Sequence, residues 1–389
     1  MLAWLVVAVI AASAGAVFTH FAWSSDSPAS PSLGARSGQG FGGEAGGGTY
    51  KRAPSAASGS ASTASGATAA VAARVDRGLV DINTTLADNA GEAAGTGMVV
   101  TSSGEVITNN HVIDGAAQIT ARDIGNGKTY TAHVVGYYPD DDVAVLALDD
   151  ASGLATVPLG NSSTAHVGAA VVTIGNAGGA GGTPAVAGGS IVAQDQSITA
   201  GDDADGSTEH LTGLIEIDGQ LQPGDSGGPL VDGSGSVVGM DTAASSGFTF
   251  RSAADQGFAI PINTVLAVSK QLVAGVGSNV IHIGPSAMIG VLVEPGGEGG
   301  YGYGAPSGSG STVSGVAVAQ TVRGGPAAHA GITAGDTITA FDGQTVSSAQ
   351  ALTALMMRHH PGDQARVTWV DSADSSHTAT LRLATGPAA

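Results

Sequence analysis

Apolar and polar positions divide the chain into four stretches with different patterns. Leu2 to Phe18 is an almost unbroken apolar run without a charged residue, and residues 24–73 consist mainly of Ser, Ala, Gly and Pro. From residue 95 to about residue 275, short runs rich in β-branched residues alternate with Gly-rich turns. A similar pattern resumes after the Gly284-Pro285 break. Short β-branched runs bounded by turn residues are typical of strands, so we predict a mainly β protein.

The predicted elements are mostly short strands. Between residues 95 and 275 we expect strands at residues 98–101, 106–108, 143–148, 169–174, 190–193, 214–217, 230–231, 237–240 and 257–260. Residues 263–274 have apolar residues at helical spacing, so we expect a helix that begins at an Asn263 cap and ends at Gly275. After residue 284 we expect strands at 288–293, 315–322, 366–370 and 378–383, with a helix at about 348–358.

The N-terminal apolar run is long enough to cross a bilayer, which needs about 20 residues. His20 and Trp23 follow the run, and both suit a membrane interface. Ala12-Ser13-Ala14 resembles a cleavage site, so a cleaved signal segment is the alternative. We expect residues 1–23 to be a transmembrane anchor or signal segment. Residues 24–75 are expected to be a disordered linker, because their composition cannot bury enough surface to offset the ordering entropy.

Composition narrows the classes of function. A chain of 389 residues is long enough for two or three domains, and it contains no cysteine, which excludes disulfides and a thiolate nucleophile or metal site. The formal net charge of −19 argues against a nucleic-acid partner and against docking on an anionic membrane by charge. The histidines and acidic runs show no metal-ligand spacing, so we expect no metal and no other cofactor.

One small-residue string carries the strongest chemical signal, Gln222-Pro-Gly-Asp-Ser-Gly-Gly-Pro-Leu230. Gly224 and Gly228 flank Ser226, and glycines here allow a sharp turn whose N–H groups come close to a substrate carbonyl. A serine hydroxyl becomes an effective nucleophile once a base takes its proton. The alternative for this string is an ordinary tight turn between two strands.

Two further polar residues lie upstream at predicted strand ends. His111 follows a predicted hairpin, and Asp142 directly precedes the apolar run from Val143 to Leu148. That position is why we prefer Asp142 to Asp140 and Asp141. The chain order His, Asp, Ser is the order of chymotrypsin and differs from the orders in α/β-hydrolases and subtilisins.

Five motifs follow one another at wide spacing. They are Thr108-Asn-Asn-His111-Val-Ile, Asp142-Val-Ala-Val-Leu, Ile174-Gly-Asn176, Gly224-Asp-Ser226-Gly-Gly-Pro-Leu and Gly257-Phe-Ala-Ile-Pro261. In these motifs the chain resembles trypsin-like serine proteases of the HtrA family, over about residues 76–385. The strings Ala330-Gly-Ile-Thr-Ala-Gly335-Asp-Thr-Ile338 and Asp342-Gly-Gln-Thr-Val346 are similar to the PDZ domains of that family.

The resemblance implies a chymotrypsin-like double β-barrel protease domain at residues 76–278. In such a domain Ser226 would be the nucleophile, His111 the general base, and Asp142 the residue that orients the imidazole. Backbone N–H groups of the Gly224-Asp225-Ser226 turn would form the oxyanion hole.

The resemblance also implies one PDZ domain at residues 284–386. A peptide C-terminus would add to its sheet as a strand. Its carboxylate would be bound by backbone N–H groups near Met288, Ile289, Gly290 and Val291. Members of this family often trimerise, so a homotrimer is expected.

Subsite residues follow from the same resemblance. Gln220 would lie at the base of the S1 pocket, and because it is not a carboxylate we expect small or medium apolar side chains rather than Arg or Lys. The strand near Asp241, Thr242 and Ala243 would pair with the substrate backbone. Family members often carry Asn directly before the serine, whereas this chain has Asp225, which must find another partner or a solvated place.

The favoured function is a membrane-tethered, extracytoplasmic serine endopeptidase that cleaves misfolded or signal proteins, with a PDZ domain that binds peptide C-termini. Its expected location is the cell membrane, as a single-pass protein, with secretion as the alternative. The competing interpretation is a non-enzymatic PDZ scaffold or chaperone with a dormant protease domain.

Overall fold

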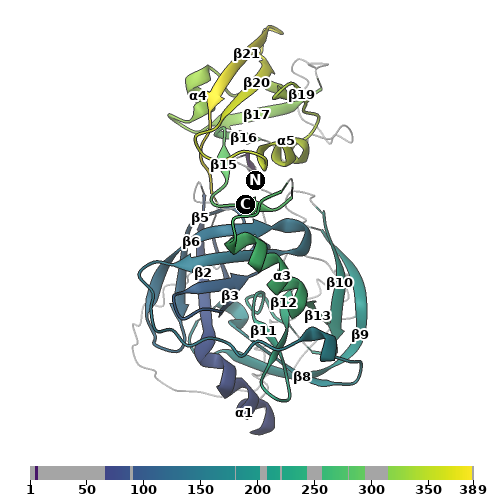
Figure 1. Ribbon diagram of the computed structural model, residues 1–389. Coiled ribbons are helices and arrows are strands. Elements are labelled where there is room, and N and C mark those ends of the chain that lie inside the picture. The colour runs from purple at the N-terminus through teal and green to yellow at the C-terminus, as the bar shows by residue number, and fades with distance from the viewer. Residues whose placement is uncertain are drawn as a thin grey trace, which may run out of the picture. The chain divides into compact units, whose positions relative to one another are not determined.

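The computed structural model describes residues 5–7, 66–87, 91–179, 181–201, 208–219, 221–242, 256–278, 280–293 and 314–387. Strands make up most of the regular structure in these ranges, as the sequence predicted (Figure 1). Two sheets lie between residues 79 and 283, and further sheets follow after residue 286.

The first sheet is antiparallel and closes on itself. Its order is β14-β6-β5-β2-β3-β4-β7, and an additional pairing of β6 with β7 joins six of its strands into a ring. The strands are β2 (Leu79–Leu86), β3 (Glu92–Val99), β4 (Glu105–Thr108), β5 (Ala116–Asp123), β6 (Thr129–Tyr138), β7 (Val143–Leu148) and β14 (His282–Ile283). Nearly every residue of β7 is buried, which explains its continuous apolar pattern.

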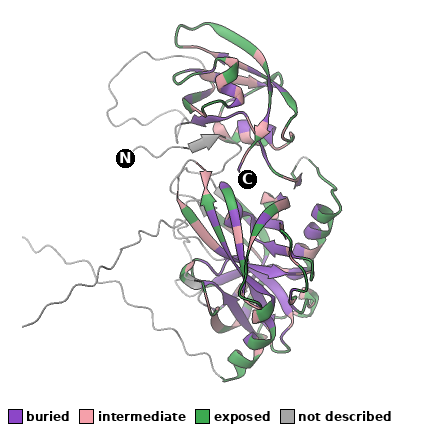
Figure 2. Ribbon diagram, turned by 90° about the vertical axis from the view of Figure 1, so that its left-hand side faces the viewer, coloured by how far each residue is buried: buried purple, intermediate pink, exposed green. Residues whose placement is uncertain are grey.

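The second sheet is a closed barrel with the order β10-β13-β12-β11-β8-β9. Its strands are β8 (Ala170–Gly175), β9 (Ala185–Gly201), β10 (Thr208–Ile217), β11 (Pro229–Asp232), β12 (Val237–Thr242) and β13 (Gly257–Pro261). Every residue of β12 and all but the last of β11 are buried, and Figure 2 colours buried residues purple. Together with the ring of the first sheet, this barrel agrees with the double β-barrel that the resemblance implied.

Helix α3 (Ile262–Val273) confirms the predicted helix, with a different start. It buries an apolar stripe at helical spacing, formed by Ile262, Val265, Val268 and Leu272. Pro261 occupies the N-cap position, and the Asn263 amide instead donates to Asn161 at 2.8 Å. At the other end Gly275 has φ +69°, the left-handed conformation that favours glycine after a helix.

The predicted linker at residues 24–75 is wrong in its last ten residues. Residues Gly66–Val75 form helix α1, followed by the 3₁₀ turn η1 (Asp76–Gly78). Ala72 and Val75 are buried in a core cluster with barrel residues such as Val172, and the Arg74 guanidinium donates to Ser234 O at 2.8 Å. Two small apolar residues on one helical face are sufficient for docking, although the composition resembles that of a linker. The shorter elements in this region are α2 (Asn110–Ile113), η3 (Pro139–Asp141), η4 (Ser162–Thr164) and η5 (Ala177–Gly179).

The C-terminal sheet has the order β1-β16-β17-β18-β20-β21, with β19 paired to β18, and β15 pairs separately with β22. Its elements are β15 (Ala287–Met288), β16 (Val291–Val293), β17 (Val316–Thr321), α4 (Pro326–Ala330), β18 (Thr337–Phe341), β19 (Gln344–Thr345), α5 (Ala349–Met356), β20 (Gln364–Val370), β21 (Ser376–Arg382) and β22 (Ala384–Thr385). The single strand predicted at 288–293 is divided in two, because Gly290 adopts φ +77° between β15 and β16.

The predicted anchor at residues 1–23 falls almost entirely outside the described residues. Within it, only β1 (Leu5–Val7) is described, and it pairs antiparallel with β16. Among the described residues, no helix combines the length and apolar character that crossing a bilayer requires.

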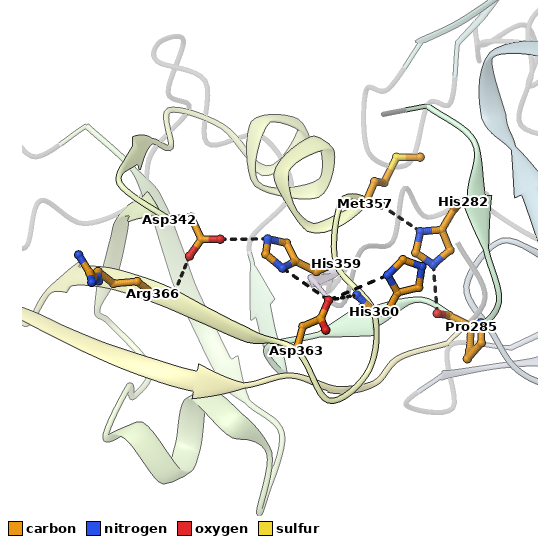
Figure 3. A network of polar contacts seen from close by, with 8 residues as sticks. All are labelled: His282, Pro285, Asp342, Met357, His359, His360, Asp363 and Arg366. Atoms are coloured by element: carbon orange, nitrogen blue, oxygen red, sulfur yellow. Dashed lines mark hydrogen bonds and ion pairs between the residues drawn. The ribbon is translucent and has the colours of Figure 1, made fainter. Parts of the chain in front are cut away.

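His282, on β14, is a buried polar residue shortly before the C-terminal sheet (Figure 3). Its Nδ1 lies 3.0 Å from Met357 O, and its Nε2 lies 3.1 Å from Pro285 O. The ring stacks on Tyr137 at 5.0 Å between centroids and on His360 at 4.9 Å. Both ring nitrogens therefore face carbonyl oxygens, which can only accept hydrogen bonds.

Candidate active site

His111 lies on a single helical turn directly after a strand of the first barrel. Strand β4 ends at Thr108, and α2 carries His111 directly before Val112 and Ile113, whose buried side chains anchor the turn. The buried Asn109 side chain donates to Asp142 O at 3.1 Å. The turn that holds His111 is thus bonded to the segment that holds the predicted triad carboxylate.

Asp142 lies at the start of β7, the strand that pairs with β4. Its backbone is left-handed, with φ 52° and ψ 46°, so its side chain turns toward His111 as the chain passes from η3 into β7. One carboxylate oxygen lies 2.9 Å from His111 Nδ1, and the other accepts the His111 backbone N–H at 3.0 Å. Asp142 is 1% exposed, so these contacts lie away from solvent. Neither Asp140 nor Asp141 is buried.

Thr242 adds a third bond to the same carboxylate. Its Oγ1 donates to Asp142 Oδ2 at 3.2 Å from the end of β12. Three contacts, two with His111 and one with Thr242, therefore fix the orientation of the Asp142 carboxylate. The sequence analysis assigned Thr242 to substrate pairing, and the structure adds this contact with the triad carboxylate.

Ser226 lies on a tight turn that requires glycine at the positions 224 and 227. Asp225 N–H donates to Gln222 O and Gly228 N–H donates to Asp225 O, both at 2.9 Å. Gly224 and Gly227 have φ of +98° and +83°. A Cβ at Gly224 would lie 2.1 Å from Asn176 O, and one at Gly227 would lie 2.1 Å from Thr96 O. The glycines of the string are therefore required by both conformation and close packing.

Thr96, on β3, connects the first barrel to this turn and was not singled out by the sequence. Its backbone N–H donates to Ser226 O at 2.8 Å, and its Oγ1 donates to Gly224 O at 2.7 Å. The same hydroxyl accepts the Asn176 N–H at 2.9 Å. A threonine in a strand gives no signal of such a role, because its partners are distant in sequence.

Of the N–H groups predicted for the oxyanion hole, that of Asp225 donates to Gln222 O, whereas those of Gly224 and Ser226 belong to peptide units with fixed orientation. Pro223 O accepts the Gly178 N–H at 2.7 Å, and Asp225 O accepts the Gly228 N–H at 2.9 Å. In a trans peptide the N–H points opposite to the carbonyl. The N–H groups of Gly224 and Ser226 are therefore directed away from these two partners.

Asp225, the departure from the family pattern, is buried rather than solvated. Its Oδ2 accepts the Gln222 N–H at 2.9 Å. Burial raises the pKa of Asp225 to about 6, and the Gln222 N–H partly offsets that effect. Asp241, on β12, is fully buried, and burial together with the nearby charge of Asp225 raises the pKa of Asp241 well above its usual range.

Of the residues predicted to contact substrate, the structure describes only some. Gln220 and Ala243 lie outside the described residues. The backbone of Asp241 is already bonded, since its N–H donates to Gly228 O at 2.7 Å and its carbonyl accepts the Gly227 N–H at 2.9 Å. Asp241 is therefore part of the barrel wall next to the nucleophile, and its predicted pairing with substrate has no support from this position.

The predicted carboxylate loop of the C-terminal domain lies between β15 and β16. Ile289 O accepts the Ala327 N–H at 2.8 Å, and Gly290 O accepts the Val322 N–H at 3.0 Å. The next N–H in each case, on Gly290 and Val291, points the opposite way. Met288 lies in β15 and pairs with Ala384. The four residues thus form a turn with two oriented N–H groups at the start of β16.

Comparison with known proteins gives the same two domains in the same order. The trypsin-like peptidase domain family matches residues 95–240, and the PDZ domain family matches residues 287–376. The chain is 29% identical to "Serine protease PepD" of Mycobacterium tuberculosis, over 80% of this chain and 65% of that protein.

Two further relatives are more similar over shorter ranges. "Serine protease Do-like HtrA" of Lactobacillus helveticus is 32% identical, over 70% of this chain and 64% of its own length. "Probable periplasmic serine endoprotease DegP-like" of Brucella suis is 35% identical, over 71% of this chain and 50% of its own length. The chain therefore spans between half and about two thirds of the length of these relatives. Both domain families and the relatives lead to one assignment: the chain belongs to the HtrA family of trypsin-like serine proteases with a C-terminal PDZ domain.

Proposed function

We propose that the chain is a serine endopeptidase that uses Ser226, His111 and Asp142. The observation that carries this proposal is the double contact of Asp142 with His111, at 2.9 Å to Nδ1 and 3.0 Å to the backbone N–H. A carboxylate at Nδ1 selects the tautomer in which Nε2 is free of its proton and can act as a base. The serine-protease names of the relatives support the same activity.

The proposed reaction follows from these roles. Ser226 Oγ attacks the peptide carbonyl while His111 Nε2 takes the hydroxyl proton. The N–H groups of Gly224 and Ser226 stabilise the oxyanion, and one such donor typically contributes about 3 kcal/mol. His111 then gives its proton to the leaving amine, and water hydrolyses the acyl-enzyme by the same steps. Asp142 stabilises the imidazolium throughout.

We further propose that the substrates are unfolded or misfolded proteins and that the PDZ domain binds peptide C-termini. The turn at residues 288–291 supports the binding of peptide C-termini. The N–H groups of Gly290 and Val291 there point away from the two N–H groups that the preceding carbonyls accept. An extracytoplasmic location is supported by the periplasmic name of the Brucella relative. Tethering to the cell membrane by residues 1–23 and assembly into a homotrimer are further parts of the proposal. No nucleic-acid partner is expected at a net charge of −19.

The test is labelling of the purified full chain with a fluorophosphonate probe, which reacts with activated serines. We expect Ser226 to be labelled, and Ser226→Ala and His111→Ala to abolish labelling. Unfolded protein and peptides with hydrophobic C-termini are added in parallel, and a change in labelling rate with the peptides would support a regulatory PDZ domain.

No labelling under any of these conditions would contradict the proposed activity. That result, with intact folding and intact binding of peptide C-termini, would favour the non-enzymatic PDZ scaffold or chaperone instead.

A further inference from the structure

Asp81 is a buried acidic residue of the first barrel, and the proposed reaction does not use it. It lies on β2, directly opposite Arg122 on β5 and Thr96 on β3. Residues directly opposite each other in antiparallel strands have their side chains on the same face of the sheet. Asp81 therefore shares a face with Thr96, whose hydroxyl binds Gly224 O beside the nucleophile.

The ion pair with Arg122 does not account for the burial of Asp81. The Arg122 guanidinium lies 3.7 Å from Asp81 Oδ2, and the Arg122 side chain is 45% exposed. An ion pair that reaches solvent contributes little, whereas a buried carboxylate is costly unless hydrogen bonds compensate it. A compensating donor comes from the loop after β8, which comprises residues 176–179 and 181–182. In this loop the Gly182 N–H donates to Asp81 Oδ2 at 3.2 Å.

Asn176 binds the same loop from its start. The residue directly follows β8 and is buried. Its Oδ1 accepts the Gly181 N–H at 2.8 Å, and its carbonyl accepts the Gly179 N–H at 2.8 Å. Side-chain oxygens of Asn176 and Asp81 thus accept the N–H groups of two successive residues of the loop.

The loop after β8 depends on these acceptors because much of its backbone is glycine. Four of its residues have positive φ, between +65° and +101°, and they are Gly178, Gly179, Gly181 and Gly182. Glycine adopts positive and negative φ about equally readily, and it loses more conformational freedom on folding than any other residue. Acceptors on other residues therefore select one conformation of this loop.

The loop after β8 also holds the peptide unit that precedes Gly224. The Gly178 N–H donates to Pro223 O at 2.7 Å, and that carbonyl belongs to the same peptide unit as the Gly224 N–H. Gly224 has φ +98°, and as a glycine it also allows other orientations of this unit. The bond from Gly178 therefore selects the orientation in which the Gly224 N–H points away from the loop.

We propose that Asp81 and Asn176 are positioning residues for the oxyanion hole. They fix the loop after β8, and the loop fixes the peptide unit that carries the Gly224 N–H. Both residues act through backbone hydrogen bonds rather than on the reacting atoms. Their loss should therefore slow the chemical step more than it weakens binding. The inference deepens the proposed hydrolase activity and rests on it.

The first experiment measures the rate of fluorophosphonate labelling of the full chain at increasing probe concentration. The maximal rate and the half-saturating concentration then correspond to kcat and KM. Complete loss of one oxyanion donor lowers kcat by about 10²–10³-fold. We expect Asp81→Ala and Asn176→Ala, which displace a donor, to lower the maximal rate by about tenfold or more, with little change in half-saturation.

Two variants separate the hydrogen bond of Asp81 from its charge. Asp81→Asn keeps an oxygen acceptor for the Gly182 N–H and should retain most of the maximal rate. Arg122→Gln removes only the cation of the ion pair and is the matched control, so it should retain the rate as well. A folded alanine variant that labels at the wild-type rate would overturn the role of its residue. An Asp81→Asn variant as slow as Asp81→Ala would overturn the role of the Asp81 hydrogen bond.

The second experiment depends neither on activity nor on the folding of the alanine variants. Amide hydrogen exchange is followed at single residues in the Ser226→Ala full chain. Gly178 and Gly181 are exposed, so their hydrogen bonds are what protects their N–H groups from exchange. We expect slow exchange at both residues. Exchange as fast as in an unfolded chain at both would overturn the proposal.

Double variants test how the contact of Asp81 reaches the oxyanion hole. Adding Asp81→Ala to Ser226→Ala should speed exchange at Gly178 by about tenfold, and adding Arg122→Gln should not. Unchanged exchange at Gly178 in folded Asp81→Ala would overturn the proposed connection. Slow exchange together with an unlabelled wild-type chain would instead count against the proposed activity alone.

Discussion

The Thr242 hydroxyl is the contact through which the second barrel reaches the triad carboxylate. It donates to Asp142 Oδ2 at 3.2 Å and is 6% exposed. Thr242→Val keeps the shape of the side chain and removes one donor from a buried charge, a loss of about 1.5–3 kcal/mol. We expect kcat/KM to fall about tenfold or more, with little change in KM.

Two controls distinguish positioning from a structural effect of Thr242. Thr242→Ser keeps the hydroxyl and should restore most of the activity. The urea midpoint of Thr242→Val is measured beside its kcat/KM, so that a loss of position can be separated from a loss of stability. Unchanged kcat/KM with reduced stability would show that the hydroxyl acts on packing alone.

Single residues with chemistry of their own could be predicted from the sequence, whereas their supporting contacts could not. Ser226, His111 and Asp142 each follow a recognisable string, and the structure brings His111 and Asp142 together. Thr96 and Thr242 are common strand residues whose partners lie 128 and 100 positions away. Such contacts depend on how the two barrels meet, which local patterns do not encode.

Among the elements, β3 has the most direct effect on the nucleophile turn. Thr96→Val removes a buried hydroxyl that donates to Gly224 O at 2.7 Å and accepts the Asn176 N–H at 2.9 Å. Leaving both partners unsatisfied costs about 2–4 kcal/mol. We expect the urea midpoint to fall and the labelling of Ser226 to slow, because Gly224 loses its anchor.

Thr120 offers a matched control for Thr96 in the same sheet. Its hydroxyl donates to Asn83 O at 3.3 Å in a more exposed place, so water can replace the bond when Thr120 is changed to Val. Equal effects of the two substitutions on stability and labelling would contradict a special role for β3.

Element boundaries were less predictable than element types. Short strands were expected from β-branched runs, but β9 extends over Ala185–Gly201, far beyond the predicted 190–193, because Gly and polar residues in it pair within the barrel. Helix α1 was missed because Gly, Ala and Thr resemble a linker in composition. In both cases pairing or docking with distant segments overrides the local pattern.

At the scale of the whole molecule, His282 connects the end of the first barrel's sheet to the PDZ domain. Its two ring nitrogens face Met357 O and Pro285 O, at 3.0 and 3.1 Å, and its ring stacks on Tyr137 (Figure 3). Carbonyl oxygens only accept, so at least one ring N–H of His282 has a buried hydrogen-bond partner. His282→Ala removes these contacts and a stacked ring from a buried place.

We expect His282→Ala to destabilise the full chain by about 2–4 kcal/mol, since a buried carbonyl loses its donor and a cavity replaces the ring. Differential scanning calorimetry of the full chain measures this, and for a chain of this size the transition midpoint should fall by several degrees. His329→Ala, at an exposed histidine on α4, is the control and should leave the midpoint unchanged. If both substitutions have the same small effect, the contacts of His282 with Met357 and Pro285 do not contribute to stability in solution. A loss confined to His282→Ala would instead show that this buried imidazole contributes to the stability of the full chain.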